Sequence, residues 1–295
     1  MILSDEEIGM VQKNESQFVS FKYLDDKGVL KQIDTSFQNI LDGKRFFSDD
    51  SINLKTIIGK AFIDPFRSFP TTSFFCENLT SKDNQRGKAI KLIDEYSEPD
   101  FVFLGAEIRF WVFKKINDCD KFTSGFVDPF ANLRSDIIAC MEKINIPTTT
   151  HNCGEIPTES VVGIEGNSIV DLADNVLLAK FIIANVTDSY GMSALFSCDP
   201  SASNLALLAR GNTERMTENA RNITRDSAKI KEVTGLKTDN LKDSSVLTIH
   251  KAELNDDLVN IKISMQTKGE FVPYLAFTEL LLYNAVGSSL GNTVF

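Results

Sequence analysis

The side chains with the clearest potential for chemistry are two opposite charges inside an apolar run. Residues 101–113 form the densest apolar stretch of the chain and hold its only tryptophan, and Glu107 and Arg109 interrupt them. Bulky and aromatic residues in such a run predict a buried strand. Strand side chains two positions apart share a face, so Glu107 and Arg109 point the same way. Because a charge there is costly unless paired or in contact with an ion, this face is either a salt-bridged rim or the wall of a present or former active site.

Two other groupings are weaker candidates for chemistry. His151 and Cys153 are two positions apart, but no third group is in place to orient a Cys/His nucleophile, so a chance pairing is the better interpretation. Residues 163–166 (Gly-Ile-Glu-Gly) are too short for a phosphate-binding loop and lack its lysine. The chain has only two histidines, which limits both metal chemistry and His-based acid–base chemistry.

Composition narrows the class of protein. The 295 residues carry a formal net charge of −10, which argues against nucleic acid or an anionic membrane as a partner. Hydrophobic residues make up 42% of the chain, enough for a sizeable core, and no apolar run approaches the ~20 residues of a membrane span. The acidic N-terminal residues do not form a signal peptide, and the five scattered cysteines contain no C-x-x-C pair. We therefore expect a cytoplasmic protein with reduced thiols.

The elements that must position these charges fall into two predicted domains, residues 1–99 and 100–295. In the first, Ser4 and Glu7 form a capping box for a helix over 5–13, and a turn at 25–28 joins two strands of a hairpin. In the second, Asp128 caps a helix that has Pro129 at its first position, and residues 169–190 form the longest helix, closed by Gly191. The remaining predicted strands span 17–23, 29–33, 61–64, 73–77, 193–198, 246–249 and 259–265, with helices at 87–96 and 271–286 and a solvated helix and loop over 210–245.

Several of these segments, taken in order, resemble glutamine synthetase. Residues 104–111 (Leu-Gly-Ala-Glu-Ile-Arg-Phe-Trp) are similar to that family's GPEPEFF strand, and residues 155–157 (Glu-Ile-Pro) to its HHEVA strand. The other similar segments are 61–66 with 72–77, 127–142, 173–196 and 273–277, so that the resemblance covers most of residues 17–200 and then 259–286. On this basis the chain is identified as a shortened, degenerate member of the family. The resemblance implies an α+β fold, with a β-grasp N-terminal domain and a catalytic-type domain built on a curved antiparallel sheet.

The resemblance also implies a metal site. Amide synthesis from glutamate, ATP and ammonia passes through an acyl phosphate, which needs Mg²⁺ or Mn²⁺ held by carboxylates. Glu107 matches the first Glu of the strand and Glu155 the Glu of HHEVA. The next family Glu is assigned to Glu165, with Glu159 as the alternative, because neither keeps the family spacing.

Other positions depart from the family pattern. Arg109 replaces the second Glu of the strand, Leu205 falls at the position of a histidine, and Lys262 and Ser264 replace a metal-binding Glu and an Arg. A guanidinium is always charged, and at ~4 Å it repels a dication by roughly 2 kcal/mol even with water-like screening. We therefore expect an Arg109–carboxylate cluster, with Glu107 and Glu155, to fill a vestigial metal site.

Three functional hypotheses follow. The first is a glutamine synthetase-like protein that has lost ATP-dependent glutamate–ammonia ligation, with no catalytic residues and no cofactor. It would act structurally or as a regulator, in a homo-oligomer or bound to an active homologue. The second is an active ATP-dependent carboxylate–amine ligase with altered metal ligands and substrate, using Mg²⁺ or Mn²⁺. The third is an unrelated α+β binding protein.

Overall fold

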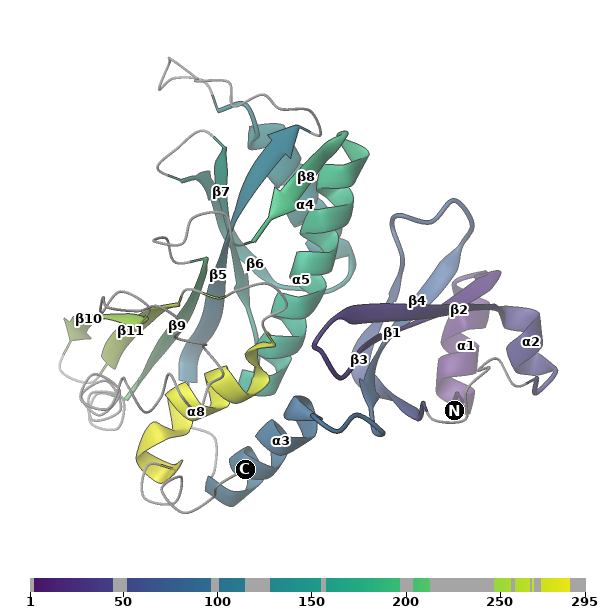
Figure 1. Cartoon of the computed structure of the whole chain (residues 1–295), viewed down its shortest axis with the longest axis horizontal. Helices are drawn as coiled ribbons and strands as arrows, with labels where there is room; N and C mark the ends of the chain where they lie inside the picture. The colour runs from purple at the N-terminus through teal and green to yellow at the C-terminus, as the bar shows by residue number, and fades with distance from the viewer. Residues whose placement is uncertain are drawn as a thin grey trace. The chain divides into compact units, whose positions relative to one another are not determined.

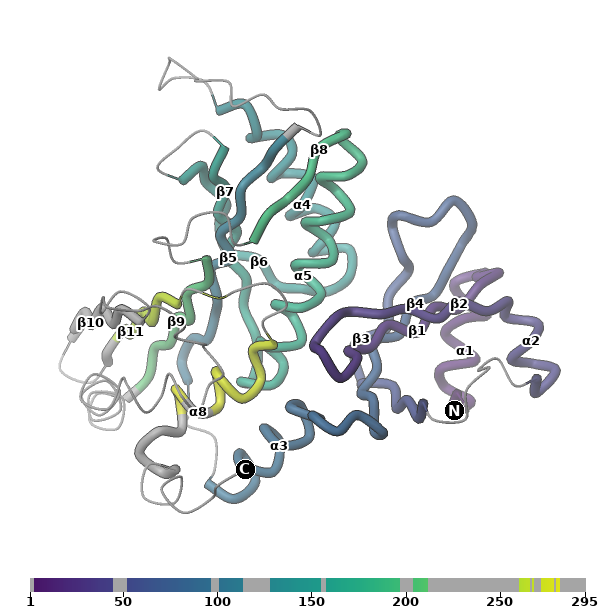
Figure 2. The backbone as a smooth tube through the Cα atoms, viewed as in Figure 1, coloured from purple at the N-terminus to yellow at the C-terminus, as the bar shows by residue number. Residues whose placement is uncertain are grey.

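A computed structural model of the chain describes residues 3–44, 52–96, 101–114, 128–154, 158–196, 204–212, 247–255, 258–265, 267 and 272–286 (Figures 1 and 2). The chain divides into two compact units, residues 1–86 with 143–145 and residues 87–142 with 146–295. The domain boundary predicted between residues 99 and 100 lies within 97–100, outside the described residues, and stays a prediction.

The first unit contains a mixed four-stranded sheet in the order β2-β1-β4-β3 (Figure 1). β1 pairs antiparallel with β2 and parallel with β4, and β4 pairs antiparallel with β3. The predicted turn is confirmed, with Gly28 at a φ of 79°. β3 begins earlier than predicted, because its Leu54 and Ile57 are buried in a segment that bulges before it pairs again. The strands span Phe18–Leu24 (β1), Leu30–Ser36 (β2), Leu54–Ile63 (β3) and Thr71–Asn78 (β4).

One face of this sheet packs against the first helix, α1 (Asp5–Lys13). The predicted capping box is confirmed, because the Ser4 backbone N–H donates to Glu7 at 2.7 Å and the Glu7 N–H donates to the Ser4 hydroxyl at 3.3 Å. Val11 lies in a core cluster with Phe21 and Phe74. A short helix that was not predicted, α2 (Phe37–Leu41), follows β2 and is capped by Ser36. This arrangement is the β-grasp-like N-terminal part expected from the sequence.

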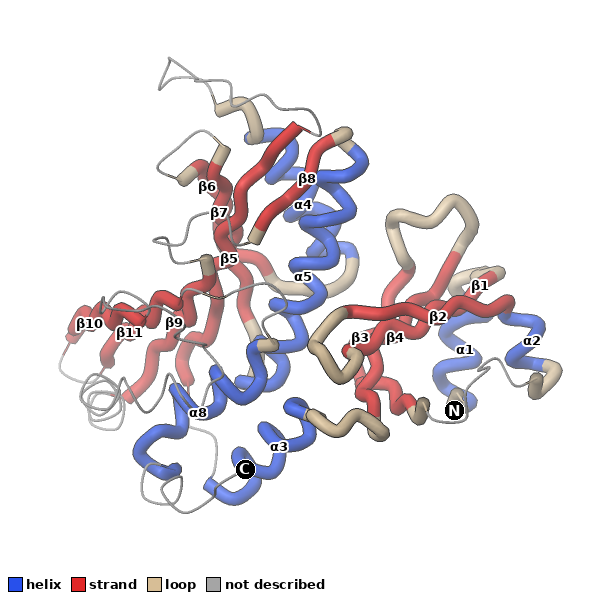
Figure 3. Tube along the Cα trace, viewed as in Figure 1, coloured by secondary structure: helices blue, strands red, loops and turns tan. Residues whose placement is uncertain are grey.

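The second unit is built on a seven-stranded sheet, whose strands are red in Figure 3. Each described pairing in this sheet is antiparallel. β5 (Phe101–Lys114) is central: it pairs with β7 along one edge and with β9 and then β8 along the other. β9 was not predicted, and its last residues, 210–212, fall in the segment predicted as a solvated helix and loop. The other strands are Thr148–Cys153 (β6), Glu159–Glu165 (β7), Met192–Leu195 (β8), Leu205–Asn212 (β9), Leu247–Asn255 (β10) and Leu258–Met265 (β11).

Helices cover one face of this sheet and define its core. The even-numbered side chains of β5 from Leu104 to Val112 are buried, with Ala106, Ile108 and Phe110 each 0% exposed. α5 (Ile169–Ser189) packs against β5 and β7 and against α8 (Pro273–Val286), and Gly191 follows it with a φ of 70°, as predicted. The other helices are α3 (Gln85–Tyr96) and α4 (Ala131–Lys143).

The start of α4 differs from the prediction. The helix begins at Ala131, because Asp128 forms a turn in which its carboxylate accepts a hydrogen bond from the Phe130 N–H at 3.3 Å. The same carboxylate pairs with the buried Arg134 one turn into the helix. Most of the solvated segment predicted over 210–245 lies outside the described residues. Within the described part of the chain, no helix has the length and apolar character needed to cross a membrane.

Candidate functional site

Strand register places the charged residues of β5 on the face opposite the buried core. Glu107 lies across from Gly163 of β7 and Ala206 of β9, and Arg109 lies across from Val161. The intervening Ile108 belongs to the buried face. Directly paired residues on neighbouring strands share a face. Glu107 and Arg109 therefore face the same way, as the strand pattern predicts.

Arg109 forms an ion pair with Glu159 of β7. Glu159 stands two positions before Val161, the register partner of Arg109, so the two side chains meet diagonally on one face. The Glu159 side chain is only 4% exposed, whereas that of Arg109 is 31% exposed. A buried carboxylate needs a partner, and the guanidinium supplies it.

Glu107 is paired with a second cation, Lys262 of β11, at 2.5 Å between the ammonium and carboxylate atoms. β9 lies between the two strands, and its Ala206 stands opposite both Glu107 and Ser264. A methyl side chain at that position leaves room for the lysine to reach across. Both groups are about a third exposed, so this pair is less buried than Glu159.

Gly154 makes room for the Glu159 carboxylate. A Cβ placed on Gly154 would lie 2.2 Å from the carboxyl carbon of Glu159, closer than atoms in contact allow. The Gly154 N–H also donates to the Glu159 carbonyl at 2.9 Å. The absence of a side chain at Gly154 therefore leaves the space that this carboxylate occupies. Whether Glu159 or Glu165 corresponds to the family glutamate stays a prediction.

The other predicted site residues lie apart from these pairs or cannot be placed. Glu165 pairs with Gly105 at the far end of β7, and its carbonyl accepts from the Asn175 side chain at 2.8 Å. Glu155 lies outside the described residues, so its part in the expected cluster with Arg109 stays a prediction. Leu205 pairs with Ile108 and is 2% exposed, so its side chain belongs to the buried face, and Ala206 occupies the face that carries Glu107.

The remaining candidate, His151, lies on the side of β6 next to α4. Its Nε2 is 3.5 Å from the Ser135 hydroxyl, and that hydroxyl already donates to the Ala131 carbonyl at 3.0 Å. The buried Nδ1 of His151 has no hydrogen-bond partner among the described residues. A serine or cysteine nucleophile needs a base that a third group orients, and this arrangement does not supply one.

The carboxylate oxygens of the described residues on this face do not form a binding site for a divalent cation. Glu107 and Glu159 each hold a cationic side chain, and the four charges of the two pairs sum to zero. Among the residues that the structure describes, no three His, Cys, Asp or Glu side chains gather as metal ligands. Mg²⁺ and Mn²⁺ prefer several oxygen ligands, so this face offers charge compensation in place of a metal cage.

Solved structures of known proteins have the same fold as this chain. The structure of Plasmodium falciparum glutamine synthetase superposes with a TM-score of 0.73 at 11% identity, covering 98% of this chain and 76% of the other. GmaS in its ADP complex superposes with a TM-score of 0.74 at 12% identity, covering 95% and 81%. The chain therefore has the glutamine synthetase fold, as its sequence predicts.

Sequence relatives point to the same family. Glutamine synthetases of Rhizobium meliloti and Nostoc sp. are 21% and 23% identical, each over 68% of this chain and 55% and 56% of their own lengths. The 3-hydroxylaminophenol mutase of Cupriavidus pinatubonensis is 22% identical over 65% of this chain and 54% of its own length. No family model matches the sequence. The chain is glutamine synthetase-like and spans about half the length of these curated relatives.

Proposed function

We propose that this glutamine synthetase-like chain does not carry out ATP-dependent glutamate–ammonia ligation and has a structural or regulatory role instead. The observation that supports the proposal is that two cationic side chains lie on this face of the sheet. Arg109 and Lys262, which stand where the family resemblance gives metal-binding glutamates, are each bound to a carboxylate.

Physical chemistry explains why these cations oppose the reaction. Phosphoryl transfer from ATP to a carboxylate depends on divalent ions that bridge phosphate oxygens. A guanidinium and an ammonium compensate the charge of the carboxylates. They cannot coordinate carboxylate and phosphate oxygens together, as a divalent metal ion does. Each also repels an incoming dication by roughly 2 kcal/mol at ~4 Å in water-like screening, and by more in a protein site.

The proposed role is within an assembly in the cytoplasm. The partner is a second copy of this chain or an active homologue. The net charge of −10 does not favour nucleic acid or an anionic membrane as the partner.

The test is calorimetric titration of the purified protein with ATP, in Mg²⁺, in Mn²⁺ and in EDTA, with thermal unfolding measured alongside. We expect no binding heat and no stabilisation in any of the three conditions. Metal-dependent ATP binding in the micromolar range would overturn the proposal, because it would mean that the carboxylates still hold a cation.

A second candidate is an active enzyme with altered metal ligands and substrate, using ATP with Mg²⁺ or Mn²⁺. One comparison favours it: a relative with similar coverage is named a mutase rather than a glutamine synthetase, so sequences of this kind are not confined to one reaction. Metal-dependent ATP binding without glutamine formation would favour this candidate, and carboxylate and amine substrates would then be screened.

A further inference from the structure

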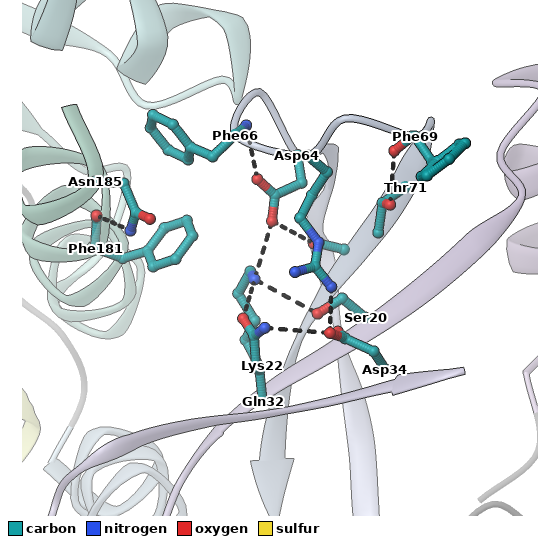
Figure 4. Close-up of polar contacts among 12 residues, drawn as sticks. Ser20, Lys22, Gln32, Asp34, Asp64, Phe66, Phe69, Thr71, Phe181 and Asn185 are labelled. Atoms are coloured by element: carbon teal, nitrogen blue, oxygen red, sulfur yellow. Dashed lines mark hydrogen bonds and ion pairs between the residues drawn. The ribbon is translucent and has the colours of Figure 1, made fainter. Parts of the chain in front are cut away.

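A second set of charged side chains lies in the first unit, far along the chain from the candidate site. Lys22 of β1 and Asp64, directly after β3, form an ion pair at 3.0 Å in which both side chains are 1% exposed (Figure 4). They lie on the sheet face opposite the core cluster that contains Phe21. Ser20, two positions before Lys22, shares this face.

The buried pair is enclosed by hydrogen bonds. The Lys22 ammonium also donates to Gln32, its register partner on β2, at 3.0 Å. Asp64 accepts from the Ser73 hydroxyl of β4 at 3.2 Å and from the Phe66 N–H at 3.1 Å. The carboxylate thus ties the start of the β3–β4 loop to β1 and β4 of the sheet.

A second ion pair holds the same loop further along. Arg67 pairs with Asp34 of β2, and both side chains are 33% exposed. Gln32 connects the two pairs, because its amide nitrogen donates to Asp34 at 3.3 Å while its oxygen accepts from Lys22 (Figure 4). Beyond Arg67, Phe69 is 59% exposed and its ring lies 6.0 Å from that of Phe18.

From this geometry we infer that two ion pairs hold the loop of residues 64–70 closed, an arrangement that we call the charge latch. The exposed outer pair opens first, and the buried inner pair then still holds the loop against the sheet. The outer pair, Arg67–Asp34, is accessible to salt, which screens exposed charges. The inner pair, Lys22–Asp64, is shielded from solvent, and breaking it would leave a buried charge without its partner. Ionic strength is therefore the variable that separates the two stages.

Limited trypsin digestion of the full chain tests the latch, because Arg67 is followed by Ser68 and offers a cleavage site inside the loop. Cleavage of a transiently open segment follows the population of the open form when reclosing is fast. We expect wild-type cleavage after Arg67 to rise with salt. Asp34→Asn should raise it about two- to fivefold at low salt, the range for one exposed ion pair, and abolish its salt dependence.

Asp42→Asn is the matched control, because Asp42 pairs with Lys44 at 2.9 Å on the surface of the same unit and touches no residue of the loop. It should leave cleavage after Arg67 at the wild-type rate. The single variant Asp64→Asn leaves the buried Lys22 ammonium without its charged partner and should raise cleavage more than Asp34→Asn at every salt concentration. Equal cleavage in wild type, Asp34→Asn and the control, or equal cleavage in Asp34→Asn and Asp64→Asn, would overturn the latch.

Discussion

Ion pairs in the two units of this chain differ in burial. We expect them to differ also in how much the loss of one partner lowers the free energy of unfolding. On the sheet of the second unit, Lys262–Glu107 is about a third exposed on both sides and Arg109–Glu159 is exposed on the arginine side. In the first unit, Lys22–Asp64 is 1% exposed on both sides. Burial raises the cost of losing one partner, so similar contacts should have different effects on stability. We therefore expect the Lys262–Glu107 pair to tolerate substitution better than the Lys22–Asp64 pair.

The largest expected effect is in the buried pair. Lys22→Met leaves the Asp64 carboxylate buried without its cation, and we expect the free energy of unfolding to fall by about 3–5 kcal/mol. Glu107→Gln, in the exposed pair, should lower it by no more than about 1 kcal/mol. Urea denaturation of both variants measures the two values. Equal losses would show that burial does not distinguish the pairs.

A charge reversal at the candidate site should create metal binding. Arg109→Glu/Lys262→Glu places four carboxylates on one face, so the variant should be less stable than wild type in EDTA. Mn²⁺ or Mg²⁺ should then stabilise it, by about 2.7 kcal/mol at a metal concentration one hundred times the Kd. Thermal unfolding with and without metal measures this.

The matched control for that reversal changes two exposed lysines of the first unit. Lys31→Glu/Lys44→Glu alters the net charge by the same amount, next to Asp25 and Asp42. It should show no metal-dependent stabilisation. Metal stabilisation of equal size in the control, or already in the wild type, would contradict the view that Arg109 and Lys262 exclude the cation.

Gly154→Ala should weaken the Arg109–Glu159 pair without changing either residue. The new methyl group would overlap the Glu159 carboxyl group, and overpacking of this kind costs roughly 1–3 kcal/mol. In a Glu159→Ala background the overlap is gone, so the loss should shrink towards zero. Gly9→Ala in α1, where no atom lies within 4 Å of the added Cβ, is the control and should be neutral or slightly stabilising. Unfolding free energies of the four variants measure the coupling.

The smallest expected effect is a pH dependence from Lys180 of α5. Burial lowers the pKa of Lys180 to about 8, and its ammonium lies 5.6 Å from the centre of the Phe196 ring. Between pH 8 and about 10.4 the unfolded chain keeps a proton that the native lysine has released, so the free energy of unfolding rises with pH in that window. We expect this rise to be about 1 kcal/mol after allowance for partial exposure of the side chain, and Lys180→Met should remove it. Lys91 is exposed, so Lys91→Met should leave the rise unchanged. Urea denaturation at pH 7.5 and 9.5 tests the difference.

Local patterns were sufficient for much of the fold. The Ser4–Glu7 capping box set the start of α1, and Gly191 marked the end of α5, because both signals act within one helical turn. α2 was missed because five residues give too little periodicity to detect. β9 was missed because its apolar part, residues 205–209, is too short for a pattern to identify a strand, and residues 210–212 have the polar character of the predicted solvated segment.

For the candidate site, the sequence by itself determined that Glu107 and Arg109 share a face, since the strand period of two fixes it within three residues. Only the tertiary structure decided their partners. Glu159 is 50 residues from Arg109 and Lys262 is 155 residues from Glu107. Those pairings depend on the register of β5 with β7 and on β9 lying between β5 and β11. Register is set by which faces of all the strands are buried together, and no single segment carries that information.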